Sequence, residues 1–527
     1  MDNQQTASSR SNDLILFWGC FLALMAAGVG FVVRAQIIGE WGSEFNLSST
    51  QKGEIFGVGL WPAAISMVLF SLVVDRVGYK NAMIFGFVCH MVGAIMTIFA
   101  KDYTTLYVAT FCMALAQGTV EAYINPAVAS LFKTEKTKWL TILHASWPVG
   151  MVFGGVLVIG LDGIFAGDQT AESMSWLWQL KVALIFIPAV AYFVMLIRSK
   201  FPVDERVEAG VPYQEMLKEF GIIGALIVIA LISAELGTHL GLSSTIIIGT
   251  VVVLTAVYAY FARSLGNPIF LILVIVMIPL ATTELGTDSW ITSLMEPEFA
   301  KLGMDSLWLL IYTSAIMAVL RFFAGPLVHR LSPLGLLAIS ALVAAGGLIF
   351  LSKATGAVIL AAATLYGVGK TFFWPTMLGV VAERFPKGGA LTLNGISAIG
   401  LLGVGIVGSV FLGNIQDNAT YNGAEAYDAA NGTAIQETYM GLEKRGIFGK
   451  YQALDQDKYS QAPEADKATI DNIQAESNKS ALATVALFPV FMLVVYIGLI
   501  LYFRSRGGYK PILLDENGNE VEVEKQH

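Results

Sequence analysis

The sequence predicts an all-α integral membrane protein, and two observations carry this prediction. Hydrophobic residues make up 55% of the chain, charged residues make up 14%, and the mean hydropathy is +0.66, outside the range of ordinary soluble domains. Apolar stretches comparable to the ~20 residues that a membrane helix needs recur from residue 13 to residue 504. So many stretches form the body of a protein, not a single anchor.

We expect about fourteen spans, each about long enough for a tilted crossing. They cover 13–35, 53–74, 81–100, 104–132, 137–160, 176–198, 219–235, 243–263, 268–291, 304–328, 334–352, 356–383, 390–413 and 480–503. We divide the chain into an N-terminal six-helix bundle at 1–198, a cytoplasmic linker with two inserted spans at 199–266, and a C-terminal six-helix bundle at 267–527. The polar segment 414–479 cannot lie in lipid. We expect it to form an external cap that continues, after Pro463, as a helix into the last span.

Lysine and arginine residues gather in alternate loops, and this bias places those loops and both termini in the cytoplasm. In the first half these residues are Arg76, Lys80, Lys133, Lys136, Lys138, Arg198, Lys200 and Arg206. Two spans within 219–263 preserve the alternation, whereas one span would invert every loop downstream. We therefore expect a multi-pass protein of the cytoplasmic (inner) membrane.

Composition and motifs exclude several other classes of function. Much of the formal charge of −8 comes from the acidic segment near the C-terminus, so it does not indicate a cationic partner, and we expect no nucleic-acid partner. Cys20, Cys89 and Cys112 lie in apolar stretches, and we expect three buried thiols without a disulfide. The polar N-terminus lacks a cleavage site, so the first helix should be retained. The sequence contains no phosphate-binding P-loop, HExxH or CxxC motif, and we expect no cofactor, metal or enzymatic activity.

Ionisable residues inside predicted spans are candidates for function, because a charge in the bilayer costs ~2.5 kcal/mol or more. Glu121 is the first of them. Gln117, Glu121 and Asn125 stand four residues apart and share one helical face, so they should line one cavity. We expect Glu121 to take part in proton coupling and its two neighbours in substrate binding. The alternative is a protonated, hydrogen-bonded structural residue.

A second group lies in the segment LYGVGKTFFWP, where Tyr366, Lys370 and Trp374 share a face. Pro375 and two glycines should break this helix, and broken helices line binding sites in transporters. An aromatic ring beside a hydrogen-bonding group suits a sugar, although such stripes more often serve packing. Lys370 needs a counter-charge, for which Glu121 of the other half is our candidate.

Further polar residues leave two interpretations open. Glu284 and Asp288 lie one turn apart near the outer end of their span, where they contact substrate and protons or simply reach outside water. His144 and His90 are candidate proton relays or satisfied core residues. We expect Arg34 to cap the external end of the first helix and to pair with an outer acid. We expect Arg321 to extend toward the cytoplasmic face. Arg34 and Arg321 are the last two charged residues that we single out within the predicted spans.

The two halves share short repeated segments, and one of them carries a family resemblance. SLVVDRVGYK, between the second and third spans, has a counterpart in GPLVHRLSPLG. The first segment resembles the motif of the major facilitator superfamily, with Ser71 where the family has Gly. The resemblance implies a fold of two six-helix bundles and a conformational latch formed by Asp75, Arg76, Gly78 and Lys80. His329 replaces the acid of the motif in the second copy.

GTVEAYINPAVASLF and LTILHASWPVG, in the fourth and fifth spans, resemble the fucose-permease branch of that superfamily. The Glu-x-x-x-Asn-Pro motif of the branch is matched by Glu121, Asn125 and Pro126, and the resemblance implies a proton-linked sugar pathway through Glu121. The chain departs from the branch in two respects. Ala35 stands where the branch has an acid in the first helix, and the two inserted spans exceed the twelve-helix plan.

These observations predict a proton-coupled symporter of a sugar or similar polyol that works by alternating access, with protons or sodium and a small solute as partners. We expect a monomer. Glu121, Lys370 and His144 are the candidate coupling residues, and Gln117, Asn125, Tyr366, Trp374, Glu284 and Asp288 are the candidate substrate contacts. The alternatives are an antiporter that exports an amphipathic solute, a peptide transporter, and a non-transporting membrane sensor or enzyme.

Overall fold

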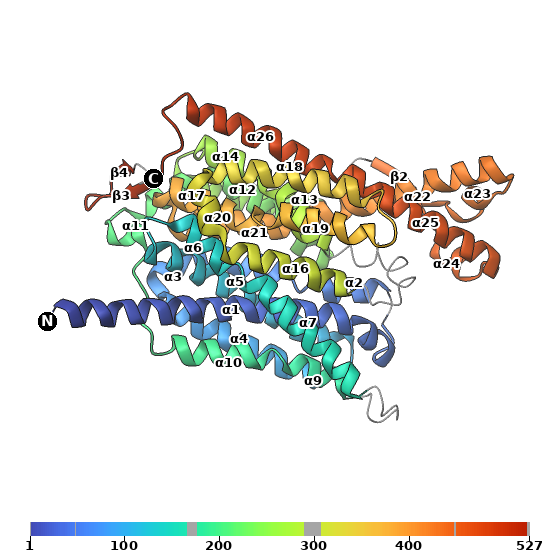
Figure 1. Ribbon diagram of the computed structural model, residues 1–527, viewed down its shortest axis with the longest axis horizontal. Helices are drawn as coiled ribbons and strands as arrows, with labels where there is room; N and C mark the ends of the chain where they lie inside the picture. Colours follow the sequence, from blue (N-terminus) through green and yellow to red (C-terminus); the bar gives the residue numbers. More distant parts are fainter. Residues whose placement is uncertain (1, 48, 166–175, 289–306, 447–448, 524–527) are drawn as a thin grey trace.

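The computed structural model describes residues 2–47, 49–165, 176–288, 307–446 and 449–523. Its long helices run side by side along the longest axis of the molecule (Figure 1). Both termini lie at one end of this bundle, together with the short helices α6, α11 and α17; we call it the terminal end. The opposite end, which carries α23 and α24, is called the distal end.

The first part of the chain forms long helices separated by tight turns. They are α1 (Asp2–Glu44), α2 (Ser49–Gly57), α3 (Trp61–Val77), α4 (Tyr79–Ile98), α5 (Tyr103–Leu131), α6 (Lys136–Leu143), α7 (Ser146–Phe165), α9 (Leu177–Ala183) and α10 (Phe186–Leu196). Asp102 and Thr105 start α5 with a reciprocal capping box, which satisfies backbone N–H groups that have no helical acceptor. Gly78, at φ +83°, joins α3 to α4 in a conformation that favours glycine.

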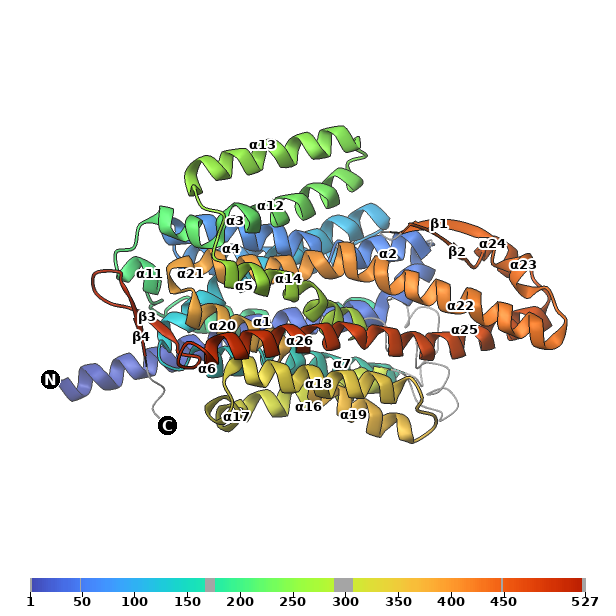
Figure 2. The same ribbon diagram turned by 90° about the horizontal axis from the view of Figure 1, so that it is seen from above.

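An inserted helical hairpin follows the short helix α11 (Glu205–Glu208). It consists of α12 (Tyr213–His239) and α13 (Ser244–Ala262), each long and apolar enough to cross a membrane. The prediction of two spans in this segment is therefore confirmed. In Figure 2, α13 lies on the outside of the bundle, beyond α12, which packs on α21. The division of the chain into three parts at 198 and 266 stays a prediction.

The rest of the described chain forms helices, several of which are broken, and short strands. They are α14 (Pro268–Ala281), the π-helix η1 (Thr282–Gly286), α16 (Leu307–Phe322), α17 (Ala324–Arg330), α18 (Pro333–Leu351), α19 (Val358–Lys370), α20 (Phe373–Arg384), the 3-10 turn η2 (Pro386–Gly388), α21 (Gly389–Leu402), the π-helix η3 (Gly403–Gly408), α22 (Ser409–Asn431), α23 (Ile435–Tyr439), β1 (Leu442–Gly446), β2 (Gly449–Ala453), α24 (Gln456–Ser460), α25 (Glu464–Val485), α26 (Leu487–Arg504), β3 (Ile512–Leu514) and β4 (Glu520–Glu522). The pairs β1–β2 and β3–β4 are antiparallel.

Within the described residues, 12 helices are long and apolar enough to cross a membrane, and a bent pair, α16 with α17, raises the number to 13. The all-α membrane fold is thus confirmed, although the apolar helices number fewer than the fourteen predicted. The additional predicted span, 104–132, forms the helix α5 of 29 residues. Polar side chains in its second half, among them Gln117 and Glu121, lower its hydropathy. The helix can carry them because they face the interior of the bundle.

The distal end extends well beyond the predicted spans. The helix predicted to end at 413 continues through α22 to Asn431, since its polar side chains lie where no lipid surrounds them. As predicted, α25 begins after Pro463 and continues into α26 (Figure 2). Tyr439, Leu454 and Ile470 belong to a small apolar core that joins the segments between these helices. The described part of the polar segment 414–479 is therefore folded, and its external location stays a prediction.

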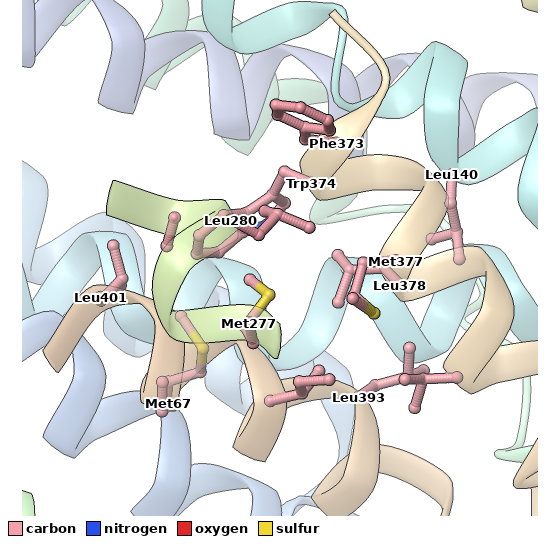
Figure 3. Close-up of a cluster of buried hydrophobic side chains, with 14 of the residues drawn as sticks. Met67, Leu140, Met277, Leu280, Phe373, Trp374, Met377, Leu378, Leu393 and Leu401 are labelled. Atoms are coloured by element: carbon pink, nitrogen blue, oxygen red, sulfur yellow. The ribbon is translucent and has the colours of Figure 1, made fainter. Parts of the chain in front are cut away.

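The halves pack through an apolar core to which both contribute. Figure 3 shows Met67 and Leu140 of the first half beside Met277 and Leu378 of the second. Small residues bring neighbouring helices close: a Cβ added at Gly118 would lie only 1.9 Å from the Ala63 carbonyl oxygen. This packing fixes the helices that carry the polar residues described next.

Candidate functional site

A small closed cavity of about 40 Å³ lies between the two halves. Its lining residues come from both halves and include six that the sequence singled out. They are Leu24, Gln117, Glu121, His144, Trp147, Glu284, Leu285, Arg321, Trp374 and Leu401. A void of this size holds a few water molecules, since one water needs roughly 10–15 Å³. A solute as large as a sugar would enter only after the helices separate.

On the side of the first half, α5 presents the predicted polar stripe to this cavity. Glu121 is 4% exposed, and its Oε2 atom has no hydrogen-bond partner among the described residues. Asn125, one turn further, has its Oδ1 atom 3.0 Å from Nε2 of His144. Asn394 of α21 donates to the Ala122 carbonyl at 3.1 Å, so this side-chain cluster joins the two halves.

On the side of the second half, the broken helix α19–α20 is held by a buried ion pair. Arg321 Nη2 lies 2.7 Å from Glu284 Oε1. Arg321 Nε donates to the Thr371 carbonyl at 2.7 Å, at the C-terminal end of α19, and Glu284 Oε2 accepts from Trp374 N at 3.0 Å, at the start of α20. The positive guanidinium thus faces the C-terminal end of α19, and the negative carboxylate faces the N-terminal end of α20. Each charge is opposite in sign to the partial charge of the helix end that it faces.

This arrangement corrects the prediction for Arg321. The side chain does not extend to the membrane surface; it is 2% exposed and its Nη1 atom donates to the His144 carbonyl at 2.8 Å. The reason is that Glu284, buried on η1, offers a counter-charge inside the bundle. Arg321 therefore links the second half directly to the first.

Lys370 pairs with Asp288, which corrects the expectation that Glu121 is its counter-charge. The ammonium also lies 5.2 Å from the centre of the Tyr366 ring, whose hydroxyl donates to the Thr283 carbonyl at 2.5 Å. Helix α14 and η1 bring Asp288 to Lys370 within the same half, and no movement of the halves is needed. Lys370 and Tyr366 do not line the cavity, whereas Trp374 does.

The two interpretations of Glu284 and Asp288 can now be separated. Both are buried and both are ion-paired, so they do not simply reach outside water. The site thus contains three carboxyl groups, those of Glu121, Glu284 and Asp288, and two basic groups, those of Arg321 and Lys370. Among the described residues, Glu121 is the carboxyl group of this set that has no basic partner.

The terminal end of the bundle is closed by buried polar contacts between the halves. Lys136 Nζ lies 2.5 Å from Oε2 of Glu205 and donates to the Ala382 carbonyl at 3.1 Å. Thr137 Oγ1 donates to Oε1 of Glu383 at 2.5 Å. We call these contacts the terminal gate. We did not predict Lys136, Glu205 and Glu383 as site residues. Their signal in the sequence was only their charge: Lys136 belongs to a basic loop, and the segments that pack against this loop carry the two acidic residues.

The predicted latch lies beside this gate. Asp75 pairs with Arg206 of α11, and the Arg76 guanidinium lies 5.7 Å from the centre of the Tyr213 ring. Gly78 supplies the turn between α3 and α4, and Lys80 is exposed without an ion pair in the described part of the chain. Through Asp75 and Arg76, this end of α3 thus contacts the linker, and the role of a conformational latch stays a prediction.

Asp204, at the start of α11, accepts hydrogen bonds from Tyr79 Oη at 3.1 Å and from the backbone N–H of Arg206 at 3.0 Å. Burial, and then the negative charge of Asp75, raise the pKa of Asp204 to about 6 from its usual 3.8.

Other singled-out residues have structural surroundings. His90 Nδ1 lies 3.1 Å from the Tyr192 hydroxyl, away from the cavity, as expected of a core residue. Arg34 packs over Phe56 and has no acidic partner among the described residues, and its predicted ion pair with an outer acid stays a prediction. Cys20 and Cys89 are buried thiols, whereas Cys112 is only half-buried.

A cavity lies between two helical halves, and broken helices line it. This arrangement is typical of membrane transporters in which the two halves move relative to each other around a central site. The family model of the Major Facilitator Superfamily matches residues 16–415. The chain belongs to this superfamily.

Solved structures of the same fold include two symporters. The proton:xylose symporter XylE aligns with a TM-score of 0.60 at 13% identity, over 93% of this chain and 96% of that one. The fucose:proton symporter FucP of E. coli aligns with a TM-score of 0.55 at 17% identity, over 91% and 98%. At these identities the likeness concerns the fold.

Curated relatives match part of the chain. The TsgA homolog of Buchnera aphidicola subsp. Schizaphis graminum is 24% identical over 198 residues, which is 37% of this chain and 48% of that protein. The D-xylose transporter of Levilactobacillus brevis is 26% identical over 151 residues, 28% of this chain and 31% of the transporter. The chain thus spans about half the length or less of these relatives.

Proposed function

We propose that the protein is a proton-coupled symporter of a small neutral polyol, a sugar being the first candidate. The observation that carries this proposal is the Glu121 carboxyl group, which is buried in the central cavity without a basic partner among the described residues. A lone carboxylate is costly in such surroundings, so the group has reason to take up a proton before the halves close around it.

The charges of the site support a neutral solute. Glu284 and Asp288 are already neutralised by Arg321 and Lys370. With Glu121 protonated, the five ionisable groups sum to zero, and the closed cavity carries no net charge. An anionic or cationic solute would disturb this balance, whereas a polyol would not.

The remaining lining residues support the same solute class. Trp147 and Trp374 offer aromatic faces, and Gln117 offers an amide that can donate and accept hydrogen bonds. Sugars combine an apolar face with a rim of hydroxyl groups, and sites that bind such solutes combine aromatic rings with a few polar groups. The names of XylE, FucP and the D-xylose transporter agree with this proposal.

We further propose that the terminal end faces the cytoplasm, with the protein in the inner membrane. The basic residues of the loops between spans gather there, as the positive-inside rule requires. The terminal gate closes one side of the described molecule, and Met151 and Ser314 are in contact between the halves nearer the distal end. Transport then requires the halves to rock and open each side in turn.

Uptake into proteoliposomes tests the proposal. Radiolabelled hexoses, pentoses, nucleosides and peptides are offered with and without an inward proton gradient. We expect the gradient to stimulate uptake of a sugar, and Glu121→Gln to abolish accumulation while sparing exchange, because a permanently neutral side chain cannot release its proton. Glu235→Gln, on the inserted helix α12, is the matched control and should behave as the parent protein.

Two results would contradict the symporter. Gradient-driven uptake that survives Glu121→Gln would remove the proposed coupling residue. Loss of preloaded amphipathic solute when protons are supplied outside, without uptake of any sugar, would instead make the protein a proton-driven exporter.

A further inference from the structure

A second cavity, of about 550 Å³, lies at the terminal end, away from the central site. It is formed by the turn between α17 and α18 and by the chain that leaves α26. Its lining residues are His329, Arg330, Leu331, Ser332, Leu334, Ile500, Phe503, Arg504, Gly507, Gly508, Tyr509 and Lys510. The cavity is therefore bounded by one half alone, and the central solute pathway does not pass through it.

The cavity is basic. Its lining, as far as the described residues go, contains two arginines, a lysine and a histidine, and no acidic residue. Among the described residues, neither the Arg330 nor the Arg504 guanidinium has an acidic partner within ion-pair distance, and both side chains are exposed. His329 differs, because its Nε2 atom lies 3.2 Å from Oε1 of Glu135. Two guanidinium groups that line one cavity without an acidic partner favour the binding of an anion there.

The shape of the cavity is built by the chain itself. Gly507 and Gly508 have φ values of +91° and +100°, which L side chains rarely adopt, and they turn the chain back after α26. The returning segment is then held: Tyr509 Oη donates to Oε2 of Glu383 at 3.0 Å, and Arg384 Nη1 donates to the Lys510 carbonyl at 2.6 Å. The basic groups thus belong to a fixed wall.

Apolar residues lie beneath this basic wall. Leu334, Ile500 and Phe503 line the same cavity, and Ile500 belongs to the last turns of the membrane helix α26. A ligand that fits would carry a negatively charged oxygen group toward the arginines and an apolar part along α26. Guanidinium groups suit phosphate oxygens because they offer paired, charge-assisted hydrogen bonds.

We propose that this cavity binds a phosphate ester, namely the headgroup of an anionic membrane phospholipid. The volume suits a group of that size. Given the orientation proposed above, the cavity opens at the cytoplasmic leaflet, which is rich in anionic lipids, and basic pockets at that level bind lipid headgroups. Occupation would hold α26, the α17–α18 turn and the returning chain together.

Lipid titration of the full-length protein tests this site. The protein is reconstituted in phosphatidylcholine nanodiscs and titrated with short-chain phosphatidylglycerol, glycerol phosphate or inorganic phosphate, with the melting temperature as readout. We expect phosphatidylglycerol to raise the melting temperature. The double variant Arg330→Gln with Arg504→Gln should lower the apparent affinity for phosphatidylglycerol in this titration at least tenfold. Arg263→Gln, an exposed arginine of the α13 turn, is the control. Lysine substitutions at 330 and 504 should retain most of the effect and show that the fold is intact.

Each other outcome overturns the proposal. Equal stabilisation by inorganic phosphate at the same concentration would assign the site to a soluble phosphate and not to a lipid. A phosphatidylglycerol effect that the double variant and Arg263→Gln reduce equally would show binding spread over the surface without this site.

The chain beyond the cavity carries an independent observation, because its hairpin β3–β4 crosses the terminal gate. Leu514 N donates to Oε1 of Glu205, the residue that pairs with Lys136, at 3.3 Å. Glu522 and Glu520 lie 3.8 Å from Arg384 Nη1 and Lys387 Nζ of the second half. The hairpin therefore contacts the linker on one side and the second half on the other.

We infer that the hairpin is a strap that holds the terminal gate closed and undocks when this end opens. Its contacts are few and mostly exposed, so they can form and break in each cycle. Spin labels placed at the ends of α6 and α20 test this inference by distance measurement. Glu520→Gln with Glu522→Gln should raise the open population several-fold, and deletion of 511–527 should raise it further. Glu516→Gln in the hairpin turn is the control; unchanged distances in the first two variants would refute the strap.

Discussion

The buried pair of Glu284 and Arg321 allows a quantitative test of how the broken helix is held. In Glu284→Gln, the guanidinium keeps its hydrogen bonds to the carbonyl groups of Thr371 and His144 but loses its counter-charge. Removing one partner of a buried ion pair costs ~3–5 kcal/mol, because the other charge stays buried. We expect a loss of unfolding free energy of this order.

The double variant Glu284→Gln with Arg321→Met distinguishes the reasons for that loss. It removes both charges and leaves a side chain of similar length, so most of the destabilisation should be recovered. The coupling between the two substitutions should then amount to ~2–3 kcal/mol in the favourable direction. The carbonyl groups of Thr371 and His144, which both lose their donor, account for the remaining cost.

Reversible unfolding of the protein in detergent with increasing denaturant measures these values for the parent, Glu284→Gln, Arg321→Met and the double variant. Circular dichroism of each folded variant shows whether the helices are retained. Additive losses in the double variant, or a single-variant loss below ~1 kcal/mol, would refute the reasoning, because the pair would then behave as exposed charges do.

Three further predictions follow from the gate, the second ion pair and the helix packing. The pKa of Asp204 is about 6 in the closed latch and 3.8 when exposed, so the closed state binds more protons between these values. Acidification from pH 6 to pH 4 should therefore favour closure by ~2 kcal/mol, and distance measurements should lose this dependence in Asp204→Asn. Lys370→Met should leave Asp288 buried without a partner and lower the unfolding free energy by ~3–5 kcal/mol, and adding Asp288→Asn should restore most of it. Gly118→Val should separate α3 from α5 and lower the melting temperature, whereas Gly53→Val, where a Cβ meets nothing within 4 Å, should not.

Part of the candidate site could be predicted because local sequence determines it. The four-residue spacing of Gln117, Glu121 and Asn125 puts them on one helical face in any helix, and two of them line the cavity. The break before Trp374 likewise follows from Pro375, which cannot donate to the preceding turn. Trp147 lines the cavity too, but nothing local separates it from an ordinary core tryptophan.

The sequence by itself determined which segments enter the membrane, since hydropathy and length depend on each segment alone: the inserted hairpin and the helix that runs from Pro463 into the last span are examples. Only the tertiary structure decided which charges meet. Lys370 pairs with Asp288 and Arg321 with Glu284 because η1 winds one turn with π geometry and presents both acids to the neighbouring helices of the same half. Such pairing depends on the rotation of each helix about its axis and on how the halves dock, and neither quantity is contained in the periodicity of a single helix.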